Sequence, residues 1–491
     1  QQAVPPDEHR WIETCGCTQS YRRLRDGIRQ YYKAHYPLTQ AAREHPQLNP
    51  GNGSVSRLCH EPKVALAVLE SFFAPYMSGR QLTLLLEHDP IRAEVEGDRV
   101  RAVTVRSLRT GNVKTLIAPF FLDATELGDL LPLTRTEFVT GAEARSQTGE
   151  SHAPAVAAPR NHQACTACFA VDVVRGGNEI IEKPREYDFW RNFTPQLQPP
   201  WPGKLLDFAY THPPTGKPKR LGFNPLGDAG EGLLNLWLYR RIADQSNFNP
   251  GAYGSDICLV NWPQNDYFLA PLIAETREAR QAQIERAKQL SLSLLYWLQT
   301  EAPRPGGGSG FPELRLRADV VGTEDGLAKL PYVRESRRIQ AVFTVVEQHV
   351  SQADRQRAGA GEAAKRGEPF FDSVGIGSYP IDLHPSTGFD NYIDFQSVPF
   401  QIPLGALLPQ RIENLLPAAK NLGVTHITNG CYRLHPVEWN IGEAAAALAA
   451  YALRHKQQPR QVRAKPSALA EFQEELRRDG FALEWPAGVP E

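Results

Sequence analysis

The chain of 491 residues lacks the features that define several large classes of protein. No apolar run approaches the length of about 18 residues that a membrane-spanning helix requires, so we expect no transmembrane segment. Neither sign of charge dominates, because 54 Lys and Arg residues face 55 Asp and Glu residues and leave a formal net charge of -1. Such a balance gives no electrostatic case for a nucleic-acid partner or for binding to an anionic membrane surface.

Cysteine is also scarce. The seven cysteines, an odd number spread along the chain, do not form the pattern of a disulfide framework. This usage favours a reducing compartment, and we expect a cytoplasmic protein. Cys165 and Cys168 form one Cys-x-x-Cys pair, but a structural zinc site needs a second pair or matching histidines. We therefore expect no metal site.

The sequence contains no Gly-x-Gly-x-x-Gly motif, the turn that binds phosphate in dinucleotide-binding folds. The glycine-rich run at 306–310 does not replace it, because Pro303 and Pro305 precede the run and no strand leads into it. We interpret that run as a flexible surface linker. The chain begins with Gln1, and Met77 is its only methionine.

What the chain does contain is an informative segment at residues 413–453. An apolar strand around Leu415 leads through a loop rich in polar residues into an Ala-rich helix. The first N–H groups of a helix have no partner inside the helix, so a helix that begins in such a loop attracts negative charge. We expect this helix to begin close to Asn440, which would act as its N-cap.

A second informative block covers residues 118–132. It predicts an apolar strand that ends in the tripeptide Ala124-Thr125-Glu126. Alternating runs with turn residues between them precede this strand, and strands spaced in this way form a meander. The runs lie at 82–87, 91–96 and 100–107.

Together the two blocks resemble the FAD-dependent oxidoreductases of the glutathione-reductase-like, two-domain superfamily. Members have a similar meander and a strand that ends in an Ala-Thr-Gly-like turn, where this chain has Glu126 in place of the glycine. The resemblance implies FAD as cofactor and hydride transfer between a small organic substrate and flavin N5. It also implies an α/β fold (α+β mixed), with a substrate domain inserted in a Rossmann-like FAD-binding domain.

The resemblance further implies that the FAD-binding domain is incomplete at its N-terminus. In the family, a segment like residues 1–8 directly follows the first β-α-β unit and its glycine turn. We expect that this unit, which would carry the pyrophosphate site, is missing. With that end absent, the sequence does not decide whether the protein is exported.

The composition changes near Thr134, where short apolar runs, Pro-rich loops and long helices begin. Helical periodicity predicts helices at 21–36, 61–76, 272–300, 332–349 and 465–480. The predicted divisions are 1–133 (first part of the FAD-binding domain), 134–368 (inserted substrate or cap domain), 369–457 (return segment of the FAD-binding domain) and 458–491 (C-terminal tail helix).

Cofactor contacts are assigned from the resemblance and from local physics. Backbone N–H groups at Asn440, Ile441 and Gly442 would supply positive potential to a flavin ring, and glycine permits close approach. The alternative is that residues 439–442 only cap a helix. The predicted cofactor-binding residues are Ala124, Thr125, Glu126, Asp129, Asn421, Gly423, Trp439, Asn440, Ile441 and Gly442.

Three groups of residues are candidates for proton transfer and substrate binding. Arg433 and His435 come just before the flavin-facing helix; His exchanges a proton near neutral pH, and Arg binds a carboxylate through two hydrogen bonds. Tyr379 and His384 lie on a strand-like stretch. Arg337 belongs to a predicted helix whose Arg-Glu-x-Arg-Arg pattern resembles one in the family. The alternatives are a structural histidine and a solvated ion-pair face.

Two other functions stay open. A reductase of activated C=C bonds would need an acid and an arginine at the ring, which His435 and Arg433 could supply. A cofactor-free remnant that binds a ligand or a partner protein would be consistent with the missing glycine motif.

Overall fold

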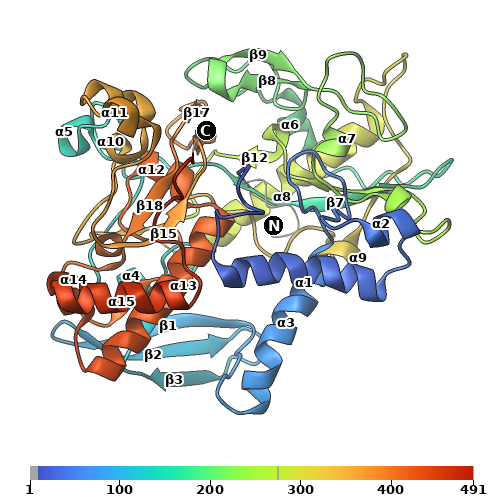
Figure 1. Ribbon diagram of the computed structural model, residues 1–491. Coiled ribbons are helices and arrows are strands. Elements are labelled where there is room, and N and C mark those ends of the chain that lie inside the picture. The colour runs from blue at the N-terminus through green and yellow to red at the C-terminus, as the bar shows by residue number, and fades with distance from the viewer. Residues whose placement is uncertain (1–8, 274–275, 490–491) are drawn as a thin grey trace.

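The computed structural model describes residues 9–273 and 276–489 (Figure 1). Residues 1–8, which we expected to follow a missing unit, lie outside the described part. The structure is mixed α/β. The main helices are α1 (Gln19–His35), α3 (Pro62–Ser78), α8 (Arg277–Thr300), α12 (His426–Tyr432), α13 (His435–His455) and α15 (Pro466–Arg478). The shorter helices are α2 (Gln40–Glu44), α4 (Leu130–Leu133), α5 (Arg145–Thr148), α6 (Tyr187–Asn192), α7 (Leu236–Tyr239), α9 (Ala318–Val321), α10 (Glu347–Val350), α11 (Gln352–Arg357) and α14 (Pro459–Ala464).

The sheets are small. The largest contains, in spatial order, β10 (Arg241–Ala243), β11 (Ile257–Val260), β7 (Phe169–Val173) and β13 (Leu314–Leu316). A meander contains β1 (His88–Glu96), β2 (Arg99–Ser107) and β3 (Val113–Ile117). The two-stranded pairs are β4 (Phe121–Asp123) with β19 (Leu415–Pro417), β5 (Phe138–Val139) with β14 (Arg338–Ile339), β6 (Cys165–Thr166) with β12 (Asp266–Tyr267), β8 (Ala209–His212) with β9 (Lys217–Arg220), β15 (Ser373–Gly377) with β18 (Phe400–Pro403), and β16 (Ile381–Leu383) with β17 (Ile393–Phe395).

The four-stranded sheet is buried on both faces. Phe169 and Val171 of β7 belong to the core that contains α8, whereas Ala170 belongs to the core that contains α1. Successive side chains of a strand point to opposite faces, so one continuous apolar run serves both cores. Figure 1 shows α1 and α8 with β7 between them.

A separate core joins α13 to the β15–β18 pair. Ile441 and Leu448 of the helix pack in the same cluster as Val374 and Ile402 of the two strands, and all four are fully buried. The parallel pair of β4 and β19 ends beside this helix, with Asp123 opposite Pro417. Every other strand pair in the described residues is antiparallel.

The amphipathic helices agree with prediction. The helices predicted at 21–36, 61–76 and 465–480 form as α1, α3 and α15. The long helix predicted from residue 272 begins at Arg277, because Thr276 caps it by accepting a hydrogen bond from the N–H of Ala279.

The meander forms with different strands from those expected. Residues 82–87 are not a strand, β1 runs through the predicted break at Pro90, and the third strand, β3, was not predicted. Pro90 is tolerated because β1 lies at the edge of the sheet and its register shifts there. The residues of β3 are all exposed, so the burial alternation that marks a strand is absent.

The helix predicted at 332–349 is wrong. Only the turn α10 is helical; residues 334–337 form no regular element, and Arg338 begins β14. Arg334, Glu335 and Arg338 are at most 3% exposed, so the predicted solvated face is wrong as well. Arg338 binds Glu143 and Glu335 through its two Nη atoms. These buried ion pairs override the helical pattern.

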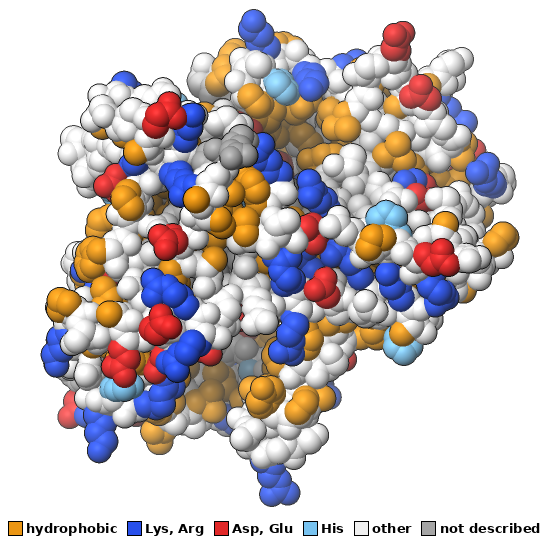
Figure 2. Space-filling model, viewed as in Figure 1, with side chains coloured by type: hydrophobic (Ala, Val, Ile, Leu, Met, Phe, Trp, Pro, Cys, Tyr) orange, Lys and Arg blue, Asp and Glu red, His pale blue; other side chains and the backbone are white. Residues whose placement is uncertain are grey.

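In the described part of the chain, no helix is both long enough and apolar enough to cross a membrane. The face in Figure 2 is hollowed between the lobe that carries β8 and β9 and the rest of the molecule, and apolar side chains gather in this hollow.

Candidate active site

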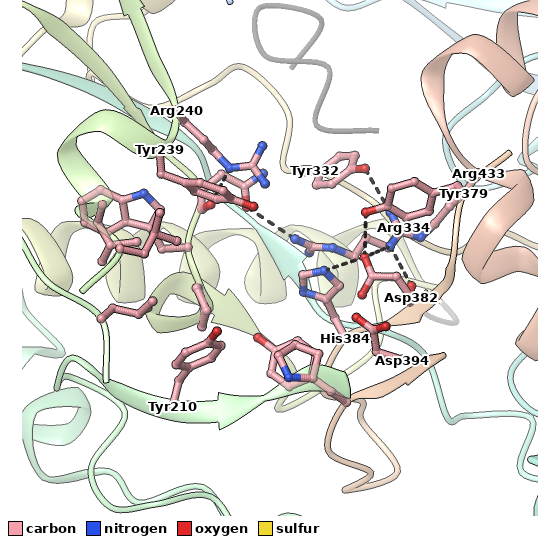
Figure 3. A pocket seen from close by; sticks show the side chains of 18 residues that line it. Tyr210, Tyr239, Arg240, Tyr332, Arg334, Tyr379, Asp382, His384, Asp394 and Arg433 are labelled. Carbon is pink, nitrogen blue, oxygen red and sulfur yellow. Dashed lines mark hydrogen bonds and ion pairs between the residues drawn. The ribbon is translucent and has the colours of Figure 1, made fainter. Parts of the chain in front are cut away.

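A cavity of about 220 Å³ lies between the lobe with β8 and the β16–β17 hairpin (Figure 3). Its two walls differ in character. One is mostly apolar and aromatic, with Tyr210, Leu221, Leu234, Leu236, Tyr239 and Trp262. The other is ionic and hydroxylated, with Tyr332, Arg334, Tyr379, Asp382, His384, Asp394 and Arg433.

The hairpin directs two carboxylates to the cavity. Ile381 and Leu383 point into the core beneath the hairpin, so Asp382 between them points the other way. Asp394 of β17 stands opposite Asp382 in the strand register. Burial and the neighbouring Asp382 raise the pKa of Asp394 to about 7. Asp394 can therefore exchange a proton near neutral pH.

His384 follows the hairpin strand and forms a pair with Asp266 of β12. Its Nδ1 lies 2.6 Å from Oδ2 of Asp266, and its Nε2 lies 3.6 Å from Oδ2 of Asp382. A carboxylate accepts a hydrogen bond, so Nδ1 carries a proton and Nε2 is the ring nitrogen that faces Asp382 and the cavity.

Asp266 is itself held from two sides. The hydroxyl of Thr166 donates to its Oδ1 at 2.6 Å, and Nη2 of Arg334 lies 3.1 Å from the same atom. Burial alone would raise the pKa of Asp266, but Arg334 and His384 lower it. The carboxylate stays ionised and fixes the histidine ring.

Arg433, at the end of α12, connects the hairpin to Tyr332. Its Nη2 donates to the carbonyl of Asp382 at 2.8 Å and to the Asp382 carboxylate at 3.2 Å, and its Nη1 donates to the hydroxyl of Tyr332 at 3.1 Å. The hydroxyl of Tyr379 donates to the same carboxylate at 3.3 Å. Burial would raise the pKa of Asp382, but His384 and Arg433 hold it well below its usual range.

The predicted tripeptide after β4 lies outside this cavity. Asp123 accepts hydrogen bonds from the N–H and the hydroxyl of Thr125, at 3.0 and 2.7 Å, while Ala124 is exposed. Asn421 donates to the carbonyl of Asp123 at 2.9 Å and so joins the ends of the two parallel strands. Gly423 is a packing position, because a Cβ there would lie 2.4 Å from the Cβ of Ala341.

Arg337 also lies away from the cavity. Its Nη1 is 2.8 Å from the carbonyl of Leu127 and 3.2 Å from Oδ1 of Asp129, which also binds Arg280 of α8 at 2.9 Å. The predicted cofactor residue Asp129 is thus occupied by two arginines.

Lys420 links β19, the tripeptide and α13. It is 4% exposed, and its Nζ lies 2.7 Å from Glu126 and 3.4 Å from Glu438. Burial would lower its pKa, but Glu438 and Glu126 raise it. Lys420 is therefore a fixed cation beside the first turn of α13.

The start of α13 differs from the prediction. The helix begins at His435, with Leu434 as its N-cap, and residues 426–432, expected in a loop, form α12. The backbone N–H groups of residues 440–442 therefore lie inside the helix and are bonded there, so the electropositive cap expected near Asn440 is wrong. Asn440 is not an N-cap; its side chain donates to the carbonyl of Val374 at 3.1 Å.

The neighbours of Asn440 also pack against protein. The indole N–H of Trp439 donates to the hydroxyl of Ser20 at 2.7 Å, and Ile441 is fully buried in the core. A Cβ on Gly442 would lie 3.1 Å from the carbonyl of Ala418, so glycine allows the helix to approach β19.

The residue at the true helix start is His435. Its side chain is buried, and its Nδ1 has no hydrogen-bond partner among the described residues. Burial, with Lys420 and Arg433 nearby, lowers the pKa of His435 well below its usual range, so the ring is neutral. Its ring lies 6.3 Å from that of Tyr332, which lines the cavity.

Comparison with known proteins decides the family. The sequence model of the family described as FAD dependent oxidoreductase matches residues 1–476. The chain belongs to this family. No match was found among curated proteins or among solved structures. FAD is the cofactor of the family.

The residues at the start of α13 fit the ring end of FAD. A buried polar atom without a protein partner, Nδ1 of His435, lies at a helix N-terminus with the cation of Lys420 beside it. His435, Lys420, Arg433 and Tyr332 would hold the ring. For the nucleotide end the chain offers no Gly-x-Gly-x-x-Gly turn, so the fit concerns the ring end alone.

Of the five predicted catalytic residues, Tyr379, His384 and Arg433 line the cavity, whereas His435 lies behind Tyr332 and Arg337 lies with Asp129. Asp266 and Asp394 were not predicted from the sequence, whereas Asp382, Tyr332 and Arg334 lie in the predicted candidate stretches but were not among the predicted catalytic residues. The alternation Ile-Asp-Leu-His at 381–384 was the available signal for Asp382, since it places the carboxylate opposite two core residues.

Proposed function

We propose that this FAD-dependent oxidoreductase oxidises a small organic alcohol in the cavity beside Tyr332. The supporting observation is the pair of His384 and Asp266, whose 2.6 Å contact leaves Nε2 of the histidine as a base at the cavity wall. A histidine held in this way by a carboxylate is a suitable general base.

The proposed oxidation removes one proton and one hydride from the substrate. The substrate hydroxyl gives its proton to Nε2 of His384, and the C–H bond of the same carbon breaks with transfer of its electron pair as hydride. FAD supplies the two-electron acceptor at N5. The product is a carbonyl compound, and the proton leaves His384 for solvent.

We also propose that residues 134–368 supply the substrate domain. Tyr210, Trp262 and Arg334 line the cavity from that part of the chain, and His384 and Arg433 line it from the return segment. A cavity shared by both parts suits a substrate held between its own domain and the cofactor.

The test starts from the protein loaded with FAD. Alcohols are mixed with it under anaerobic conditions, and loss of flavin absorbance is followed. His384→Gln should slow this reduction about 10²–10⁴-fold, because a general base contributes a factor of this size. His45→Gln, an exposed histidine outside the cavity, is the matched control.

Two results would reject the proposal. Reduction at the wild-type rate in His384→Gln would remove the histidine from the reaction. A protein that stays colourless with added FAD would instead support the cofactor-free alternative.

A further inference from the structure

Resting on the proposed function, we propose that the cavity takes a neutral polyhydroxylated ring, a monosaccharide or cyclic polyol, and that Asp394 binds one of its hydroxyls. Three features of the cavity support the proposal: its charged groups already form ion pairs, hydroxyl groups lie along its wall, and its volume is small.

The guanidinium groups of the cavity are engaged by protein atoms. Arg334 pairs with Asp266 at 3.1 Å, and Arg433 pairs with Asp382 at 3.2 Å. Arg240 donates through Nε to the carbonyl of Asn261 at 2.9 Å and lies over the ring of Tyr239. An anionic ligand that binds Arg334 or Arg433 would compete with the buried carboxylate that each already pairs with, and disturbing a buried ion pair is costly.

A cationic ligand is disfavoured for a different reason. It would enter a cavity that three guanidinium groups line, and like charges repel most strongly where water is excluded. The carboxylates of Asp266 and Asp382 already form ion pairs with Arg334 and Arg433, so they are not available to a cationic ligand.

Of the two carboxylates that line the cavity, Asp382 is paired, whereas Asp394 has no hydrogen-bond or ion-pair partner among the described residues. Asp382 lies opposite it in the hairpin register, and His384 and Tyr210 line the same cavity. Because its pKa is raised to about 7 by burial and by Asp382, it can both donate and accept a hydrogen bond near neutral pH. A hydroxyl group complements both forms.

The rest of the lining matches a sugar ring. Tyr210, Tyr239 and Tyr379 bring phenol hydroxyls to the cavity, and Leu236 and Trp262 provide an apolar wall for the C–H face of a ring. The volume of about 220 Å³ has room for several waters, which suits a single ring.

Three probes that share one ring separate the charge classes: glucose, glucuronate and glucosamine. Galactose, mannose and myo-inositol extend the neutral set. Binding to the purified full-length protein is measured by isothermal titration calorimetry. We expect at least one neutral probe to bind at least tenfold more tightly than glucuronate and glucosamine. Tighter binding of either charged sugar, or no binding of any neutral probe, would overturn the proposal.

Two variants test the residues. Asp394→Asn and Tyr210→Phe should each weaken binding of the best neutral probe by about five- to tenfold. The matched controls are Asp188→Asn and Tyr76→Phe, at exposed positions outside the cavity, which should leave binding unchanged. Melting temperatures identify any variant that fails to fold. Wild-type binding by both cavity variants would remove Asp394 and Tyr210 from the site.

Binding is read separately from flavin reduction, so the two proposals can fail separately. A neutral polyol that binds but never reduces the flavin would leave the ligand class standing and reject the oxidation. Flavin reduction by a charged sugar or by a simple alcohol, without binding of any polyol, would support the oxidation and reject the ligand class.

Discussion

Nδ1 of His384 lies 2.6 Å from the carboxylate of Asp266, although 118 residues separate the two in the chain. Asp266 is 1% exposed and is held by Thr166 and Arg334, so it cannot turn away from the ring. The contact fixes the tautomer of the histidine and aims Nε2 at the cavity. The proposed chemistry therefore depends on a residue that does not line the cavity.

Replacing this carboxylate by an amide should stop proton transfer while the ring stays in place. In Asp266→Asn the amide N–H₂ can donate to Nδ1, which moves the ring proton to Nε2 and removes the base. We expect kcat to fall about 10²–10⁴-fold with little change in bound flavin. Stopped-flow measurement of anaerobic flavin reduction checks this outcome.

The control for that variant is Asp172→Asn. Asp172 is also buried and also pairs with arginines, Arg315 and Arg317, but it lies on β7 away from the cavity. It should lose stability without losing turnover per bound flavin. Equal turnover in both variants would show that Asp266 has no part in positioning His384.

His435 should act as a neutral group. Burial lowers its pKa well below the usual range, so the ring does not change charge at the pH of ordinary assays. We expect His435→Gln to weaken FAD binding about tenfold, the loss of one hydrogen bond of roughly 1.4 kcal/mol, and to leave the pH profile of turnover unchanged. Fluorescence titration with FAD and kcat/KM at several pH values measure the two effects.

The exposed His455→Gln is the comparison for His435. A pH profile that moves in His435→Gln but not in His455→Gln would mean that His435 titrates during turnover.

Arg433 should matter for stability as well as for the site. It is 3% exposed, and its loss leaves the Asp382 carboxylate without its guanidinium partner. Arg433→Met should lower the free energy of unfolding by about 3–5 kcal/mol, as for other buried ion pairs broken on one side. Adding Asp382→Asn should recover part of the loss, because the orphaned charge disappears. Thermal melts compare the variants.

An exposed ion pair serves as the comparison for the stability loss in Arg433→Met. Arg454 binds Glu475 but is 55% exposed, so Arg454→Met should cost about 1 kcal/mol or less. No recovery in the double variant of Arg433 and Asp382 would contradict the assigned pairing.

Local patterns predicted the elements whose stability is local. The amphipathic spacing of α1 and α15 could be read from the sequence, since each helix has one apolar face. The body of α8 was predicted as well, but its start was placed at residue 272 and not after the cap at Thr276. The segment from Arg334 to Arg338 could not. Its helical pattern is outweighed by ion pairs with Glu143, Glu335 and Asp266, two of which lie in distant parts of the chain.

Some residues of the candidate site could likewise be predicted from the sequence, and others could not. Arg433 was recognisable because it directly precedes the predicted cofactor helix, and His384 was recognisable because it ends a strand-like stretch. Asp266 and Asp394 were not, because a single aspartate has no signal until folding brings it to a histidine or a hairpin partner. The predicted start of α13 near Asn440 is too late, because Pro436, a favourable residue for a first helical turn, lies in the first turn of the helix.

Glu150 should make the stability of the protein depend on pH. It is 1% exposed, its Oε1 accepts hydrogen bonds from Thr425 at 2.6 Å and from the N–H of Glu347 at 2.9 Å, and its Oε2 has no partner among the described residues. Burial raises its pKa from 4.5 to about 7. The folded state therefore holds this proton more tightly than the unfolded state does.

This difference in proton affinity sets the direction in which stability changes with pH. Below about pH 4.5 the carboxyl is protonated in both states, and its protonation favours neither. Between about pH 4.5 and 7 the unfolded chain ionises first, so stability falls as the pH rises, by up to about 3 kcal/mol in all. Glu150→Gln keeps an acceptor for Thr425 and Glu347 and carries no charge. It should therefore melt higher than the wild type at pH 8 and alike at pH 4, while exposed Glu70→Gln changes neither. An equal difference at both pH values would show that Glu150 is ionised throughout and that Oε2 has a partner after all.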